Sequence, residues 1–214
     1  MYSVSHNLRG PLASLMGLLS IAKESDSEHK FDDIHGMMRT TMRKLDETLR
    51  EIVDYSRNAR GELKRDIVDW DLLVSDVFRR LEYLLTDKVV TPVVDIQCDG
   101  PVISDSDRIA IVLTNLVSNA IIFCSPMRKS HVSITIRTHA SGATITVSDN
   151  GIGIRKDVVP KVWNMFYRGN EASQGAGLGL YITREAVFRL RGSITLHSDV
   201  DLGTVVLVEI PNLK

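Results

Sequence analysis

The 214 residues are 43% hydrophobic and 25% charged, which is the balance of an ordinary globular protein. The 26 lysines and arginines nearly cancel the 27 aspartates and glutamates, so we expect no nucleic-acid surface and no acidic tail. Cys98 and Cys124 lack the spacing of a zinc site or disulfide framework, which fits a reducing compartment. No apolar run reaches the roughly 18 residues that span a bilayer. We therefore expect a cytoplasmic segment without membrane contact of its own, excised from a longer protein that can be membrane-associated elsewhere.

Residues 1–62 are predicted to form two helices. Mostly apolar side chains recur at spacings of three and four: Val4, Leu8, Leu12, Leu15, Leu19 and Ala22 in the first helix, and Ile34, Met38, Thr41, Leu45, Leu49, Ile52 and Tyr55 in the second. The polar stretch 24–28 between them predicts a turn, and thus an antiparallel helical hairpin. Because a hairpin of about 60 residues buries too little surface to be stable alone, we expect a homodimer in which two hairpins form a four-helix bundle. Packing of the hairpin on its own C-terminal part is the alternative.

Residues 63–214 alternate between strand and helix patterns. Strands are predicted over 67–70, 93–98, 132–138, 143–147, 193–197 and 204–210, and helices over 71–85, 105–123 and 176–190. The first of these helices has Asp71 as its expected N-cap. Interleaved elements whose later strands suit hairpins predict an α+β fold. We expect a two-layer α/β sandwich with a mixed sheet and with helices on one face.

Two motifs in this second part place polar residues where the core does not need them. NLVSNA (115–120) puts Asn115 and Asn119 on one helix face, and amide oxygens suit a Mg²⁺ ion that keeps waters and phosphates. A pair of hydrogen-bonded core amides is the alternative. In DNGIGI (149–154), Asp149 can accept a hydrogen bond from an amine, and the glycines let the backbone approach a flat ring. Taken alone, the same letters are typical of an ordinary turn.

A third motif, GAGLGL (175–180), opens a predicted helix, where backbone N–H groups can bind an anion. A lone GxGxG pattern is weak evidence for a nucleotide. The dinucleotide-binding interpretation fails because no strand precedes the motif directly, and a Walker loop would need GK[ST], which is absent.

A fourth motif, SHNLRGPL (5–12), contains His6 inside a helical pattern. Since each residue advances a helix by about 100°, His6 points away from the apolar stripe that Val4 and Leu8 begin. An outward histidine suits a nucleophile that meets a phosphate carried by another domain. An isolated surface histidine beside a kink at Pro11 is the alternative.

In this order and spacing the motifs resemble the catalytic core of the sensor histidine kinases of two-component systems, over essentially the whole chain. SHNLRGPL resembles the H box, NLVSNA the N box, DNGIGI the G1 box, WNMFYR (163–168) the F box and GAGLGL the G2 box. The N, G1 and G2 boxes also fit gyrase, mismatch-repair ATPases and heat-shock chaperones, and the preceding H box separates those cases. The resemblance implies a dimerisation and histidine-phosphotransfer domain over 1–62 and an ATP-binding domain of the GHKL (Bergerat) fold over 63–214.

The resemblance also implies ligands and residue roles. ATP with Mg²⁺ would phosphorylate His6, and the phosphoryl group would pass to an aspartate in the receiver domain of a response regulator. Asn119 would ligate Mg²⁺ with Asn115 close by, and Arg168 would reach the terminal phosphate. The residues implied at the adenine base and the lid are Asp149, Gly151, Gly153, Ile154, Phe166 and Thr204. Those implied at the phosphates are Gly175, Gly177, Leu178 and Gly179.

Three positions depart from the family pattern. Asn7 stands where an acidic base is usual. Because its amide oxygen can still fix the imidazole tautomer, we expect slower autophosphorylation rather than none. Gly10 lacks the side chain assigned to phosphatase action, which predicts weak phosphatase activity, and Ile122 replaces a phosphate-binding lysine. These departures favour, as an alternative, a degenerate kinase that acts as a nucleotide-binding scaffold. A histidine phosphotransferase is a further alternative, opposed by the retained glycine motifs.

Overall fold

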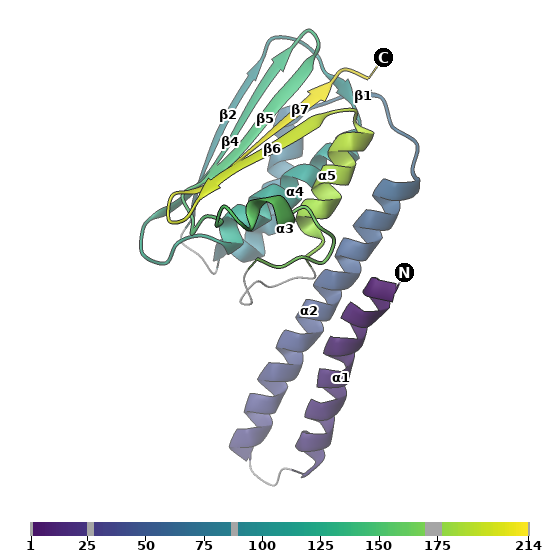
Figure 1. Ribbon diagram of the computed structural model, residues 1–214, viewed down its shortest axis with the longest axis vertical. Helices are drawn as coiled ribbons and strands as arrows, with labels where there is room; N and C mark the ends of the chain where they lie inside the picture. The colour runs from purple at the N-terminus through teal and green to yellow at the C-terminus, as the bar shows by residue number, and fades with distance from the viewer. Residues whose placement is uncertain (1, 25–27, 87–89, 170–176, 214) are drawn as a thin grey trace.

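The computed structural model describes residues 2–24, 28–86, 90–169 and 177–213. Two long helices project from an α/β sandwich, and the N-terminal end of the first helix lies at the end of the pair nearest the sandwich (Figure 1). None of the described helices has the length and apolarity of a membrane span.

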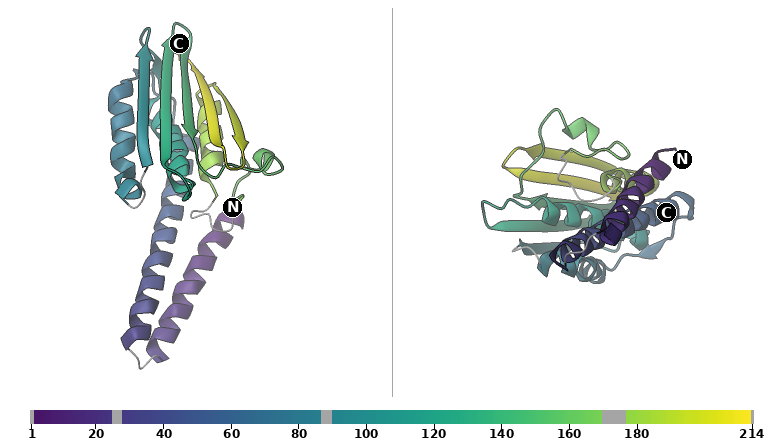
Figure 2. Two further views of the ribbon diagram at one scale, coloured as in Figure 1. Left: turned by 90° about the vertical axis from the view of Figure 1, so that its left-hand side faces the viewer. Right: turned by 90° about the horizontal axis from the view of Figure 1, so that it is seen from below.

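The two N-terminal helices, α1 (Tyr2–Glu24) and α2 (Glu28–Arg60), pack against each other and lie side by side in Figure 1 and in the left view of Figure 2. Leu15 of α1 and Ile34 and Met38 of α2 are buried between them. Other large apolar side chains of the pair remain exposed, namely Leu12, Met16, Leu19, Ile21, Met37, Met42, Leu49 and Val53. Among the described side chains of the pair, more large apolar residues are exposed than buried.

A five-stranded sheet forms one layer of the sandwich, in the order β2-β4-β5-β7-β6. Its strands are β2 (Val90–Cys98), β4 (Ser130–His139), β5 (Gly142–Asp149), β6 (Ser193–Asp199) and β7 (Gly203–Pro211). β2 pairs with β4 in parallel, whereas the other neighbouring strands pair antiparallel. The prediction of a mixed sheet is confirmed. A separate two-stranded ladder joins β1 (Asp66–Ile67) to β3 (Ile103–Ser104), which the sequence analysis did not predict.

The second layer consists of α3 (Trp70–Thr86), α4 (Ser106–Ile122) and α5 (Gly179–Arg189), which cover one face of the sheet (Figure 2). α4 is central and packs on both α3 and α5. Its apolar side chains, such as Leu113 and Val117, are fully buried. They meet the inward side chains of β4, where Ile134 and Ile136 alternate with partly exposed residues. This continuous core holds α4 rigidly against the sheet and therefore fixes the residues that α4 presents to its surroundings.

The first helix of the sandwich begins earlier than the sequence predicted. The expected strand over 67–70 is only two residues long as β1, and Trp70 already begins α3. Asp71 is not the N-cap, because it lies in the first turn of the helix. Asp69 takes this role, since its carboxylate accepts a hydrogen bond from the Leu72 N–H at 3.0 Å.

Two other element ends also differ from the predictions. β2 begins at Val90 rather than at 93. Pro92 lies inside the strand, which is tolerated because β2 is at the edge of the sheet. α5 begins at Gly179, and the predicted helix start at 176 lies outside the described residues.

Candidate functional site

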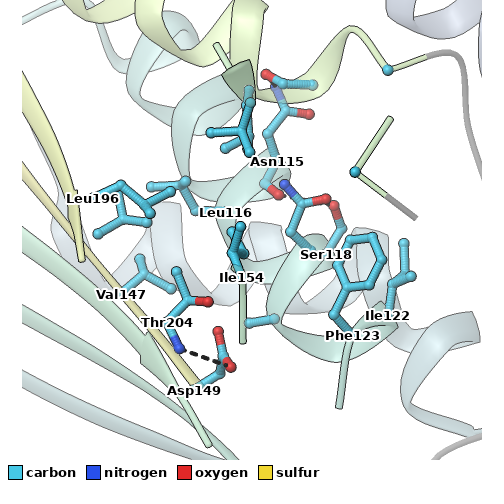
Figure 3. A pocket seen from close by; sticks show the side chains of 18 of the residues that line it. Asn115, Leu116, Ser118, Ile122, Phe123, Val147, Asp149, Ile154, Leu196 and Thr204 are labelled. Carbon is cyan, nitrogen blue, oxygen red and sulfur yellow. Dashed lines mark hydrogen bonds between the residues drawn. The ribbon is translucent and has the colours of Figure 1, made fainter. Parts of the chain in front are cut away.

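A cavity of about 1390 Å³ lies between the helix pair and the sandwich, along α4. Small-ligand sites usually have volumes of about 300–1,000 Å³, so this cavity has room for a nucleotide and for a group that approaches it. The predicted site residues that line it are Asn115, Asn119, Asp149, Gly153, Ile154, Arg168, Gly177, Gly179 and Thr204. Asp149 and Thr204 lie together at one end, whereas Asn115 lies at the other (Figure 3).

Asp149 ends β5 and points into the cavity (Figure 3). Its Oδ1 atom accepts hydrogen bonds from the Gly151 N–H at 2.8 Å and the Thr204 N–H at 3.3 Å. Burial raises the pKa of the carboxyl above its ordinary value of 3.8, although the two backbone donors act in the opposite direction. These bonds fix the carboxylate, so Oδ2 is oriented for a donor on a ligand.

The two glycines after Asp149 are required by close backbone contacts. A Cβ on Gly151 would lie 2.3 Å from the carbonyl oxygen of Phe123, so only glycine fits beneath the end of α4. Gly153 has φ of +67°, and a Cβ there would lie 2.0 Å from the carbonyl oxygen of Asp199. Gly151 itself does not line the cavity; it packs behind Asp149, whereas Gly153 and Ile154 reach the cavity wall.

Ser198 is a site residue that the sequence analysis missed. Its Oγ donates to the Gly203 carbonyl at 2.8 Å, accepts from the Ile154 N–H at 2.8 Å, and lies 2.9 Å from the Oγ1 of Thr204. Strand register explains this, because Ser198 pairs with Thr204, which pairs in turn with Asp149. Three polar side chains thus form a row across β6, β7 and β5 at one end of the sheet.

At the other end of the cavity, the amides of α4 meet the start of α5. The Asn115 Nδ2 donates to the Gly179 carbonyl at 3.2 Å, and the Thr183 hydroxyl donates to the same carbonyl at 2.8 Å. Asn119, one turn further along α4, lines the cavity. Asn115 therefore joins the two helices, and its hydrogen bond bears out part of the core-amide interpretation.

Phe166 and Gly177, which precede α5 in the chain, have unusual backbone conformations. Phe166 has φ of +65°, and its N–H donates to the Gly177 carbonyl at 2.9 Å. Gly177 has φ of +73°, and a Cβ there would lie 2.7 Å from the Tyr167 carbonyl oxygen. Phe166 and the fully buried Leu178 do not line the cavity, in contrast to Gly177, Gly179 and Arg168. These two residues support the site rather than face it.

Three predicted site residues lack a described environment. Gly175 lies outside the described residues, and of His6 and Asn7 only the backbone is described, within the first two turns of α1.

The helix pair contributes to the wall of the same cavity. Asp46, Leu49 and Val53 of α2 line it, as does Ile122 near the end of α4. Ile122 and Phe123 lie next to each other at the cavity (Figure 3). An apolar side chain thus occupies the position where the family pattern has a lysine.

A metal ion would find few ligands here besides the α4 amides. Within residues 2–24, 28–86, 90–169 and 177–213, no cluster of three or more His, Cys, Asp or Glu side chains could hold a metal. The Asn119 amide oxygen is a hard, neutral ligand at the cavity wall. One such ligand fits Mg²⁺, which keeps several waters and binds mainly through phosphates.

Comparisons with known proteins identify the relatives of this chain. The family described as histidine kinase-, DNA gyrase B-, and HSP90-like ATPase matches residues 104–214. The sensor histidine kinase RppB of Synechocystis sp. is 29% identical over 98% of the chain and 48% of its own length. The sensor-like histidine kinase SenX3 of Mycolicibacterium smegmatis is 30% identical over 98% of the chain and 56% of its own length. The chain thus spans about half the length of these relatives.

Solved structures share the fold. The Acinetobacter baumannii histidine kinase AdeS superimposes with a TM-score of 0.75 at 21% identity, covering 98% of both chains. The histidine kinase ThkA, in complex with response regulator protein TrrA, superimposes with a TM-score of 0.74 at 22% identity. The match covers 98% of this chain and 60% of that chain. Full-length ShkA in complex with AMPPNP superimposes with a TM-score of 0.70 at 20% identity. The match covers 100% of this chain and 45% of that chain. The chain belongs to the family of histidine kinase-, DNA gyrase B- and HSP90-like ATPases, and the relatives that it matches over nearly its whole length are sensor histidine kinases.

Proposed function

We propose that this chain is the catalytic core of a protein-histidine kinase that transfers the γ-phosphoryl group of ATP to His6 and then to an aspartate of a response regulator. The observation that carries the proposal is the carboxylate of Asp149. It is fixed by the N–H groups of Gly151 and Thr204 at one end of a cavity whose other end is formed by Asn115 and Asn119.

The adenine base would bind at the Asp149 end. The carboxylate accepts a hydrogen bond from the exocyclic amine, which is stronger than a bond between neutral groups. Gly153 and Ile154 supply backbone and apolar wall against the ring, and apolar side chains such as Val147 and Leu196 complete the pocket. A guanine oxygen at the same place would meet the carboxylate as a second acceptor and be repelled.

The phosphates would extend toward α5. Gly177 and Gly179 flank the start of that helix, where backbone N–H groups favour anions. The Asn119 oxygen would hold Mg²⁺, which neutralises charge on the phosphate oxygens when bound. Arg168 lines the same cavity, and we expect its guanidinium to meet the terminal phosphate.

His6 would accept the phosphoryl group. It belongs to the first two turns of α1, and the N-terminal end of α1 is the end nearest the sandwich (Figure 1). An imidazole nitrogen attacks the γ-phosphorus, the bond from that phosphorus to the β–γ bridging oxygen breaks, and ADP leaves with the electron pair. The Asn7 side chain would hold the reactive tautomer by accepting a hydrogen bond from the other ring N–H.

The helix pair would dimerise, with a domain boundary at residues 62 and 63. The exposed apolar residues of α1 and α2 need a partner, and a second copy of the pair supplies one as a four-helix bundle. The partner in signalling would be the receiver domain of a response regulator, and the structurally similar kinase ThkA forms a complex with the response regulator protein TrrA.

A labelling experiment tests the proposal. The chain is incubated with γ-labelled ATP and Mg²⁺, without any donor protein, and then with receiver domains. We expect label on the chain and its transfer to one receiver, with both lost in Asp149→Ala. A chain that acquires label only from another phosphoprotein would instead be a histidine phosphotransferase.

A second candidate function rests on Ile122. An apolar side chain in the place of a phosphate-binding lysine favours a degenerate kinase that binds the nucleotide as a signalling scaffold. Measurable ATP binding without any incorporated label would establish this candidate instead.

A further inference from the structure

The hydroxyl of Ser198 has a hydrogen-bonding pattern that leaves a single arrangement of its proton. A serine hydroxyl has one hydrogen to donate and two lone pairs that accept. The Gly203 carbonyl at 2.8 Å can only accept, so it takes the Ser198 hydrogen. The Ile154 N–H at 2.8 Å can only donate, so it occupies one lone pair.

The remaining lone pair of Ser198 must therefore accept from Thr204, whose Oγ1 lies 2.9 Å away. The hydrogen of the Thr204 hydroxyl points at β6 and is not available to the cavity. Thr204 lines the cavity and Ser198 does not. What Thr204 presents to a ligand is thus lone pairs alone.

Thr204 lies beside Asp149, which also presents acceptor atoms. The two residues are direct neighbours in the β5–β7 ladder, and the Thr204 N–H binds the Asp149 carboxylate at 3.3 Å (Figure 3). This end of the cavity therefore carries acceptors from two adjacent side chains. A ring edge that brings an amine meets them with hydrogens, whereas the same ring without an amine brings only acceptor nitrogens.

We infer that Ser198 is a specificity-determining positioning residue: by holding the hydroxyl hydrogen of Thr204, it makes this end of the cavity select a 6-aminopurine over the same purine without the amine. The inference rests on the proposed nucleotide site. Ser198 acts through Thr204 and does not touch the ligand.

The test measures binding rather than turnover. Affinities for ATP and for purine riboside triphosphate, which lacks the 6-amino group, are determined by calorimetry for the full chain and its variants. In Ser198→Ala the Thr204 hydroxyl is released and can turn its hydrogen toward a ring nitrogen. We expect the ratio of the two affinities to fall about tenfold. Ser198→Thr keeps a hydroxyl and should keep the ratio.

The Thr204→Val background shows whether Ser198 acts by positioning the Thr204 hydroxyl or only by supporting the neighbouring loop. In that background the hydroxyl is gone, so adding Ser198→Ala should leave the ratio unchanged. Ser193→Ala is the matched control, since Ser193 lies on the same strand and binds the Glu209 carboxylate outside the cavity. If Ser198→Ala does not fold, Thr204→Val against Thr204→Ser still measures how the hydroxyl contributes to the ratio, and equal ratios in these two variants overturn the inference.

Two further results would overturn the role inferred for Ser198. If Ser198 only supports the loop at Ile154, Ser198→Ala weakens both ligands equally and the ratio stays the same, which overturns the inference while leaving ATP binding intact. If the unaltered chain binds neither triphosphate, the proposed function itself fails and the inference falls with it.

Discussion

The Arg108 guanidinium donates a hydrogen bond to the Gly61 carbonyl at 2.6 Å, and so ties the segment after α2 to the first turn of α4. The same guanidinium reaches the Glu62 carbonyl at 3.2 Å and pairs with the Asp105 carboxylate. Asp105 in turn caps α4 and accepts from the Lys64 N–H at 3.0 Å. Because α4 carries Asn115 and Asn119 at its other end, one rigid helix connects the linker of the helix pair with the candidate nucleotide site.

Arg108→Ala should destabilise the chain strongly. The side chains of Arg108 and Asp105 are 6% and 1% exposed, and removing one partner leaves a buried charge without compensation. We expect a loss of about 3–5 kcal/mol in the free energy of unfolding, measured by urea denaturation. Lys64→Ala is the control, because its ion pair with Asp107 is exposed and should leave the midpoint unchanged. A loss below about 1 kcal/mol for Arg108→Ala would show that the pair behaves like a surface ion pair.

ATP affinity should fall in mild acid because of Asp149. Burial raises the pKa of this carboxyl above 3.8 in the free protein, and the amine needs the ionised form as acceptor. As the pH falls through the raised pKa, the carboxyl becomes protonated and affinity is lost. The loss therefore begins at a higher pH than for an exposed aspartate. Calorimetry at about pH 5 and about pH 7 checks this. Asp149→Asn should bind weakly at both values, and an equal pH dependence in the variant and the unaltered chain would exclude Asp149 as its source.

Gly153→Ala should damage the adenine end of the cavity. The φ of +67° and a Cβ position 2.0 Å from the Asp199 carbonyl oxygen force the loop to move. We expect a destabilisation of about 1–3 kcal/mol together with weaker ATP binding. Gly100→Ala is the matched control, since a Cβ there meets nothing within 4 Å. Equal stability and ATP affinity of the two variants would contradict the described loop geometry.

Ile122→Lys should strengthen ATP binding. Ile122 lines the cavity, and an ammonium group there would add a charge-assisted contact to a phosphate. We expect affinity for ATP to rise about tenfold. The gain should be smaller for an inorganic polyphosphate, which lacks the adenosine part. Met127→Lys adds the same charge at a residue that is 89% exposed and away from the cavity wall. An equal gain from Met127→Lys would assign the effect to net charge alone.

Strong local patterns made much of this predictable from sequence. Period-two alternation predicted strands of the sheet, and the pattern over 105–123 predicted the helix that is α4. Asn115 and Asn119 were proposed because two amides share one face of an apolar helix, and Asp149 because it ends a strand; all three line the cavity. Gly153 was chosen because a glycine lets the backbone approach a flat ring; the structure shows a different constraint there, a φ of +67° and an Asp199 carbonyl oxygen that leaves no room for a Cβ.

Contacts that depend on register or tertiary structure were not predictable. Ser198 is an ordinary serine in an edge strand, and only the pairing of β6 with β7 brings it to Thr204. Arg108 follows Asp105 at a common helical spacing, and nothing local reveals its bonds to Gly61. Leu178 lies inside a motif typical of nucleotide-binding sites, yet its large apolar side chain is buried in the core.

The most direct test of the account is the chemical identity of the phosphorylated residue. The chain and its His6→Gln variant are incubated with γ-labelled ATP and Mg²⁺, and the label is followed in acid and in base. The account predicts label on the unaltered chain that is lost in acid, survives base and is absent from His6→Gln. Label that persists in the variant, or that resists acid, would contradict His6 as the acceptor.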